Sequence, residues 1–252
     1  MKIIVCGKGG SGKSTVSTML ARAFNETGAN VLVIDADDSN LGLHRLMGAK
    51  SPVVLMDSLG GKKGFKQKTQ SAFPGAPGGL FSDRMTLDEI PCECLSEVDG
   101  IKLFATGKIH TAGEGCACPM GRLSKMILSR LVIKENDVVI IDTAAGVEHF
   151  GRGLDTSCDL VLGVVDPTYE SFLLVEKISS MTAEAGLSFA VVLNKVDETT
   201  AAVMENNVDM GKVLGSINND QSVFLSGLEG KPLNQNVNDM LDIVSKIKNL
   251  NN

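Results

Sequence analysis

The sequence predicts an α/β fold in which a largely parallel, twisted sheet is flanked by helices. Short, continuous apolar runs are typical of strands that are buried on both faces of a parallel sheet. Segments with helical spacing of apolar residues lie between these runs, and such alternation is typical of βαβ units in a doubly wound, Rossmann-like sheet. The predicted strands are Ile3–Cys6, Val31–Ile34, Val138–Ile141, Leu160–Val165, Phe189–Leu193 and Val213–Ile217.

The predicted helices follow from apolar residues that recur three or four positions apart. They are centred on Val16–Phe24, Met120–Leu131, Phe172–Ile178 and Val237–Val244. Gly28 is expected just past the end of the first helix, where a left-handed residue is favoured. Asp166 and Pro167 are expected as the N-cap and first residue of the third helix.

Length and composition favour one domain over residues 1–252, with a flexible loop or insertion around residues 57–82. Residues 60–79 are rich in glycine and lysine and contain two prolines, a composition that indicates a loop. A solvated loop is the favoured interpretation of its lysines, and a docking surface for an acidic partner is the alternative. These lysines are Lys62, Lys63, Lys66 and Lys68.

Charge and hydropathy exclude several classes of protein. The formal net charge is −6, which argues against a nucleic-acid partner because such proteins carry a basic face. The longest apolar run is far shorter than the roughly 20 residues of a membrane-spanning helix. The N-terminus lacks the apolar core of a signal peptide. We therefore expect a cytoplasmic protein with no membrane partner.

A phosphate-binding loop is the strongest motif in the chain. Residues 7–14, Gly-Lys-Gly-Gly-Ser-Gly-Lys-Ser, match G-x-x-x-x-G-K-[ST] and lie between a predicted strand and a predicted helix. Backbone N–H groups and the helix N-terminus would hold the phosphates of ATP or ADP, Lys13 would reach the β- and γ-phosphates, and Ser14 would bind Mg²⁺. The expected nucleotide-binding residues here are Gly9, Gly10, Ser11, Gly12, Lys13, Ser14 and Thr15.

Acidic residues follow two further strands, at the edge of the sheet where ligands bind in open α/β folds. Asp35, Asp37 and Asp38 follow the second strand, and mutual repulsion of their carboxylates favours a nearby cation. Asp142 ends another apolar strand and is expected to reach Mg²⁺ through water. Residues 143–146 follow it and are expected near the γ-phosphate.

A base-recognition motif follows the fifth predicted strand. Residues 194–197, Asn-Lys-Val-Asp, match N-K-x-D, in which the polar side chains bind the base edge and the lysine stem packs on the ring. Asn194 and Lys195 are therefore expected at the nucleotide. An aspartate at Asp197 would suit guanine, whereas the type of phosphate loop favours adenine, so the base stays open with ATP preferred over GTP.

Two C-x-C pairs could supply metal ligands. Cys116 and Cys118 can aim two sulfurs at one ion, which is half of a tetrahedral shell. A second copy of the chain related by a two-fold axis would complete a four-sulfur site for Ni²⁺ or Zn²⁺. Cys92 and Cys94 of the same chain could complete it instead. Ordinary reduced cysteines or a strained disulfide are the alternative for each pair. Cys6 and Cys158 are expected in the core.

These motifs resemble those of the MinD/ParA group of ATPases, whose deviant Walker A loop has a second lysine where this chain has Lys8. Within that group, the chain looks like a CooC-type nickel-insertion ATPase, on the phosphate loop, the acidic cluster, the C-x-C at residues 116–118 and the run from Asp142 to Gly153. The resemblance implies that Lys8 contacts the nucleotide of the second subunit in a homodimer and that Asp37 positions the attacking water. It also implies a client nickel enzyme such as carbon monoxide dehydrogenase, or a related acetyl-CoA synthase system.

The sequence therefore predicts an ATP-hydrolysing metallochaperone, with Lys8, Lys13 and Asp37 as the catalytic residues. Two alternatives stay open. An iron–sulfur ATPase would also use thiolates at a dimer axis, and a ParA/MinD-like positioning ATPase would need a DNA-binding face or a membrane-targeting tail. A structural histidine is the favoured interpretation of His149, and a role in sensing nucleotide or binding metal is the alternative.

Overall fold

The computed structural model describes residues 1–70, 84–109, 118–147, 157–233 and 238–250. Within them, eight strands form one sheet with the order β3-β4-β2-β5-β1-β6-β7-β8, and every neighbouring pair is parallel except β3 with β4. The strands are β1 (Lys2–Gly7), β2 (Asn30–Ala36), β3 (Leu95–Val98), β4 (Ile101–Ala105), β5 (Asp137–Thr143), β6 (Leu160–Val165), β7 (Phe189–Val196) and β8 (Val213–Asn218). The predicted fold class is confirmed.

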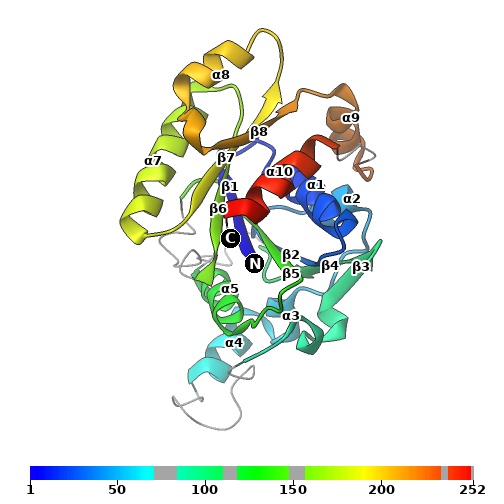
Figure 1. Cartoon of the computed structure of the whole chain (residues 1–252). Helices are drawn as coiled ribbons and strands as arrows, with labels where there is room; N and C mark the ends of the chain where they lie inside the picture. The colour runs from blue at the N-terminus through cyan, green and yellow to red at the C-terminus, as the bar shows by residue number, and fades with distance from the viewer. Residues whose placement is uncertain (71–83, 110–117, 148–156, 234–237, 251–252) are drawn as a thin grey trace.

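Helices cover both faces of this sheet (Figure 1). They are α1 (Lys13–Glu26), α2 (Leu43–Met47), α3 (Leu55–Ser58), α4 (Gly61–Gln70), α5 (Cys118–Arg130), α7 (Tyr169–Ala185), α8 (Ala201–Asn207), α9 (Gln221–Glu229) and α10 (Asn238–Leu250). Short 3₁₀ helices cover Leu87–Glu89, Cys92–Cys94 and Met210–Lys212. No helix in these ranges is long and apolar enough to span a membrane.

Two main hydrophobic clusters lie on opposite faces of the sheet, because successive strand residues point to opposite faces. Ile3 and Val5 of β1 pack in one cluster with α1 and α10. Ile4 and Cys6 of the same strand pack in the other cluster, with α3, α4 and α5. The strand alternation therefore fixes which helices cover which face.

All six predicted strands are present, and the structure adds two that the sequence did not reveal. β4 was missed because Lys102 interrupts its apolar run, and β3 because it is a short edge strand that buries no residue fully. Since β4 pairs with β2, the segment that follows β4 lies beside the acidic residues that follow β2.

The expectation of a loop from residue 57 onward is wrong as far as residue 70. This segment contains the end of α3 and all of α4, and Phe65 of α4 is 2% exposed in the same cluster as α5. Burial of this aromatic ring stabilises a helix whose glycines and lysines would not predict one. Residues 71–82 of the predicted loop lie outside the described residues.

The predicted N-cap at Asp166 is also wrong. Helix α7 begins at Tyr169, with Thr168 in the N-cap position. Asp166 instead directly follows β6. Its carboxylate accepts a hydrogen bond from Thr168 Oγ1 at 2.9 Å and faces the phosphate-binding loop. Gly28 adopts the expected left-handed conformation just past the end of α1.

Candidate functional site

The phosphate-binding loop connects β1 directly to α1, and glycine is required at two of its positions. Gly7 has a φ of 149°, and a Cβ there would lie 2.4 Å from the carbonyl oxygen of Val164. Gly12 has a φ of 96°, and a Cβ there would lie 2.2 Å from the Asn194 side-chain nitrogen. Any larger residue at either position would displace the loop from the neighbouring strands.

Two polar groups of this loop indicate a ligand. Ser11 is fully buried, and its hydroxyl has no hydrogen-bond partner in the described part of the chain. Lys13 is 7% exposed, and its ammonium group donates to the carbonyl of Lys8 at 3.2 Å. Because buried polar groups are normally satisfied, the loop is suited to an anionic group that could accept from both.

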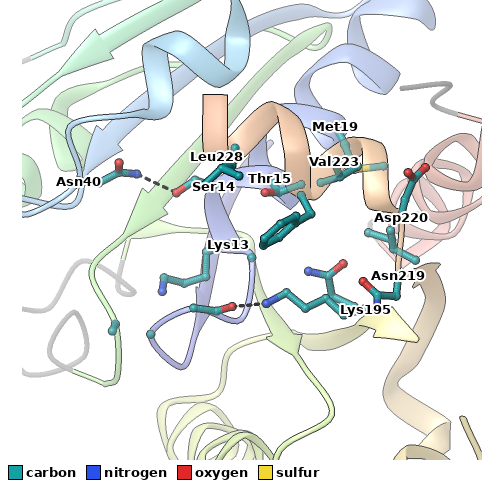
Figure 2. Close-up of a pocket in the computed structure, with 18 of the residues that line it drawn as sticks. Lys13, Ser14, Thr15, Met19, Asn40, Lys195, Asn219, Asp220, Val223 and Leu228 are labelled. Atoms are coloured by element: carbon teal, nitrogen blue, oxygen red, sulfur yellow. Dashed lines mark hydrogen bonds between the residues drawn. The ribbon is translucent and has the colours of Figure 1, made fainter. Parts of the chain in front are cut away.

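Lys13 and other residues of the loop, though not Ser11, line a cavity of about 670 Å³ at the carboxyl ends of the strands (Figure 2). The predicted residues that line it are Gly9, Gly10, Gly12, Lys13, Ser14, Thr15, Asp37, Asn194 and Lys195. A cavity of this size lies in the range of ordinary small-ligand sites. The structure therefore brings together most of the residues expected at the nucleotide.

A buried carboxylate lies beside Ser14. Asp142 ends β5 and accepts hydrogen bonds from Ser14 Oγ at 2.6 Å and from Ser17 Oγ at 3.1 Å. Burial raises the pKa of Asp142 to about 6, against the opposing effect of the two hydroxyls and of the Lys13 charge. A hydroxyl and a carboxylate in contact are the oxygen ligands that Mg²⁺ prefers, so these residues fit the predicted magnesium site.

The segment after Asp142 returns to the phosphate-binding loop. Gly146 N–H donates to the carbonyl of Gly7 at 3.1 Å, and a Cβ on Gly9 would lie 3.6 Å from the Cβ of Ala145. Residues 143–146 therefore lie against the loop, where the sequence placed them.

The acidic residues after β2 occupy different environments. Asp37 lines the cavity, and one of its carboxylate oxygens accepts from Ser39 N–H at 2.9 Å and from Ser39 Oγ at 2.6 Å. Asp38 is buried. Asp35 is buried against an ammonium group, at 2.7 Å from Lys108 Nζ. Of the three, only Asp37 lies on the cavity wall.

Sequence reasoning missed two polar residues at this edge, Asn40 and Lys108. The Asn40 amide donates to Ser14 Oγ at 2.8 Å, as Figure 2 shows. Lys108 follows β4 and donates to the carbonyl of Asp37 at 2.5 Å. The only available signal for Lys108 was its position just after an apolar run, and that run had not been identified as a strand.

The residues after β7 differ in role from the expectation. Asn194 donates from its amide to the carbonyl of Ser11 at 2.7 Å, and Lys195 donates to the carbonyl of Gly10 at 2.6 Å (Figure 2). Both side chains thus hold the phosphate-binding loop rather than project at a base edge. Asp197 accepts from Thr199 and Thr200, does not line the cavity and so gives no support for guanine.

The other end of the cavity is apolar and was not predicted. Phe224 is 61% exposed although it is a large aromatic residue, and it lies on α9, which buries none of its residues. The apolar side chains at this end are Met19, Ile217, Val223, Phe224 and Leu228. An exposed aromatic ring at the end of a phosphate-binding cavity is suited to stacking against a nucleotide base.

Lys8 has a contact within its own chain. Its ammonium group lies 3.7 Å from a carboxylate oxygen of Asp166, with the Lys8 side chain 25% exposed. Lys8 therefore has a carboxylate partner in its own subunit. The pair is long and Lys8 is partly exposed, but the Asp166 side chain is only 8% exposed, so release of Lys8 would leave a buried carboxylate without this cation.

Only part of the predicted metal site lies in the described residues. Cys116 and His149 lie outside them, and Cys118 is the exposed first residue of α5 and is disulfide-bonded. Since metals bind the thiolate, Cys118 must be reduced before it can act as a ligand. Within the described ranges, no three histidine, cysteine or acidic side chains are placed to hold a metal ion.

The two cysteines of the second C-x-C pair differ in exposure. Cys94 is buried, and burial raises the pKa of its thiol, whereas Cys92 is exposed. Burial raises the pKa of Cys6 to about 12, as expected for an inert core thiol. Cys158 is half-buried.

Basic side chains surround Cys118. Three of the predicted lysines, Lys62, Lys63 and Lys66, line a cavity of about 460 Å³ together with Arg122 and Cys118. The lysines come from α4 and the arginine from α5, so the positive charge is gathered by two helices. This arrangement is suited to the acidic partner that was the alternative interpretation of the lysine cluster.

Comparison with known proteins gives consistent matches along the chain. A family model described as the CobQ/CobB/MinD/ParA nucleotide binding domain matches residues 2–233. An uncharacterized ATP-binding protein of Methanocaldococcus jannaschii is 45% identical over 244 residues, which are 97% of this chain and 98% of that protein. The carbon monoxide dehydrogenase accessory protein CooC of Rhodospirillum rubrum is 33% identical over 231 residues, which are 88% of this chain and 85% of that protein.

A solved structure shows the same fold. The septum site-determining protein MinD of Pyrococcus horikoshii, complexed with Mg-ADP, matches with a TM-score of 0.70 and covers 99% of this chain and 96% of its own. The two sequences are 18% identical, so this likeness concerns the fold alone.

Proposed function

Because this chain is a P-loop ATPase of the CobQ/CobB/MinD/ParA nucleotide-binding family, we propose that it uses ATP to load or deliver a divalent metal, Ni²⁺ or Zn²⁺, for a nickel enzyme. The observation that carries the proposal is the similarity to a carbon monoxide dehydrogenase accessory protein across most of the chain, together with the C-x-C at residues 116–118. The client would be carbon monoxide dehydrogenase or a related acetyl-CoA synthase system.

The nucleotide half of the mechanism follows from the cavity. Backbone N–H groups of the phosphate-binding loop and the Lys13 ammonium group hold the phosphates, and the apolar wall with Phe224 accepts the base. Ser14 and Asp142 would hold Mg²⁺, which when bound screens the charge of the phosphates. Asp37 on the cavity wall accepts a hydrogen bond from the attacking water and orients it.

The proposed active unit is a homodimer in which Lys8 reaches the nucleotide of the second subunit. Lys8 lies on the phosphate-binding loop, and in the described part of the chain its ammonium group contacts the carboxylate of Asp166. Dimer formation would exchange this carboxylate for the more strongly charged phosphates. Hydrolysis then removes the negative charge that holds Lys8 across the interface.

The metal half requires the same dimer. Cys116 and Cys118 supply two thiolates per chain, and a second copy on a two-fold axis supplies the other two. The buried sulfur of Cys94 argues against an intrachain site that would use Cys92 and Cys94 together. The basic cavity beside Cys118 would receive an acidic segment of the client.

Metal analysis of reduced protein, purified without oxygen, tests this proposal. We expect one divalent metal ion per two chains, nickel and zinc competing for it, and turnover of ATP. One metal ion per chain, reduced in the Cys92→Ser/Cys94→Ser variant, would contradict the interface site. Iron and sulfide with broad visible absorption would favour the iron–sulfur ATPase instead.

A further inference from the structure

Lys108 is a buried lysine whose ammonium group meets three oxygen acceptors. Nζ lies 2.7 Å from Asp35 Oδ2 and 2.5 Å from the carbonyl of Asp37, and it also donates to the carbonyl of Asn40. The side chain is 8% exposed. An ammonium group has three N–H donors, so all of them are used.

Two of the three acceptors, the carbonyls of Asp37 and Asn40, belong to the loop after β2 that forms one wall of the nucleotide cavity, and the third is the carboxylate of Asp35 near the end of β2. Asp37 and Asn40 line the cavity, and the Asn40 side chain donates to Ser14 Oγ at 2.8 Å. Ile109 N–H adds a backbone hydrogen bond to the carbonyl of Asp38 at 3.0 Å. The segment after β4 therefore holds residues 37–40 through the side chain of Lys108 and through the main chain of Ile109.

The same segment packs against the helix that begins at Cys118. A Cβ on Gly107 would lie 2.6 Å from Met120 Cγ, so α5 lies directly against the backbone at residue 107. Ser124 of α5 donates to Thr106 Oγ1 at 2.9 Å, and both side chains are buried. Residues 106–109 thus contact the cavity loop on one side and the first turns of α5 on the other.

We propose that Lys108 is a positioning residue that fixes Asp37 and Asn40 for hydrolysis and transmits the nucleotide state of their loop to the start of α5. A shift of the loop moves its carbonyl oxygens and hence the ammonium group they hold. The close contact of Gly107 with Met120 passes that shift to α5, since a packed contact cannot absorb it locally. The inference rests on the ATPase activity and not on the proposed binding of Ni²⁺ or Zn²⁺, and its test needs no metal other than Mg²⁺.

The test compares Lys108→Met with Lys102→Met. Lys102 is a control within β4 itself, and its ammonium group pairs with the exposed Asp88. We expect Lys108→Met to lower kcat by about 10- to 100-fold, since misplacement by about 1 Å has effects of this order. The affinity for ADP, measured by calorimetry, should change by less than about threefold because the phosphate-binding loop is untouched. Lys102→Met should match the wild type in both.

Amide hydrogen exchange supplies a readout that a purely structural role would not move. In the wild type, a non-hydrolysable ATP analogue and ADP should give different exchange in the first turns of α5, and in Lys108→Met this difference should disappear while both ligands still bind. If Lys108→Met folds poorly, the double variant Lys108→Met/Asp35→Asn replaces it, because it also removes the buried Asp35 charge that the single variant leaves behind. The double variant should show the same loss of the exchange difference. Wild-type kcat, a persistent exchange difference in these variants, or no difference in the wild type would overturn the proposal.

Discussion

At the nucleotide edge, Asp142, Asp35 and Asn194 are buried and each is held by hydrogen bonds or an ion pair to a neighbouring element. Around Cys118, the cysteine and the basic side chains of Lys63 and Lys66 are exposed. The first region has its polar groups already placed, as electrostatic stabilisation of a reaction requires. The second offers a single described sulfur and a basic cavity.

This difference indicates how each region is completed. A small anion together with a cation would complete the first region, because the phosphate-binding loop already holds its hydrogen-bond donors in place. Under the proposed function, the second would depend on a macromolecule, either a second copy of the chain or a client, to supply the remaining metal ligands. The two regions should therefore respond separately to substitution, and the predictions below test that separation.

Removal of both sulfurs should have the largest effect. Cys116→Ser/Cys118→Ser takes every proposed ligand from the interface site, so metal binding should be lost entirely, along with any metal-dependent dimer. Nucleotide affinity should stay within about twofold, since Cys118 does not line the nucleotide cavity. Metal analysis and calorimetry on the same reduced sample measure both. Retention of stoichiometric metal would disprove the site.

Lys13→Met should produce the complementary loss. Hydrogen bonds from a charged group are worth roughly 1.5–3 kcal/mol each, so the affinity for ATP and ADP should fall by about 100-fold. Metal uptake by the reduced protein should not change, and circular dichroism should show an intact fold. Lys177→Met on α7 is a control that alters charge away from the cavity. Unchanged nucleotide affinity would remove the assignment of Lys13.

Acid should weaken the nucleotide site through Asp142. Burial raises the pKa of this carboxyl to about 6, and Mg²⁺ needs the ionised form. Binding therefore releases a proton, and the affinity for Mg-ADP should be constant well above pH 6 and fall by up to about tenfold per unit below it. Calorimetry in buffers of different ionisation enthalpy measures the proton. Binding of ADP in the presence of EDTA should lack this proton release from Asp142, and so should binding of Mg-ADP to Asp142→Asn.

Phe224→Ala should have the smallest effect. Stacking of a base on an aromatic ring is worth roughly 1–3 kcal/mol, so at this exposed position the affinity for ATP should fall by about fivefold. The affinity for inorganic triphosphate, which has no base, should stay the same. Leu225→Ala on the same helix is a matched control because Leu225 does not line the cavity. An equal loss for triphosphate would show that Phe224 acts on the loop and not on the base.

Sequence patterns predicted the residues that lie on or directly after buried strands. The phosphate-binding loop, Asp37 and Asp142 are positioned by local connections to β1, β2 and β5, so periodicity and motif spacing were sufficient. Lys108 and Phe224 could not be predicted, because Lys108 reaches the loop of the cavity wall through strand pairing, and Phe224 reaches the cavity through helix packing between distant segments.

The N-K-x-D pattern illustrates the same limit. Its position after β7 was predicted, but motif spacing does not say that Lys195 adopts a left-handed backbone conformation, with a φ of 59°, and returns to Gly10. The direction of a side chain depends on the backbone conformation at that residue, which the pattern does not record.

Exchange of the Lys8–Asp166 ion pair for a contact in the second subunit would tie turnover to the amount of protein. If Lys8 acts across a dimer, two such pairs are lost per association and only paired chains hydrolyse ATP, so hydrolysis in dilute solution is limited by the association of two chains. In that regime, mass action makes the dimer population grow with the square of the chain concentration. A modest rise in synthesis of the chain would therefore raise ATP consumption more than proportionally, and scarce copies would leave the nucleotide pool untouched.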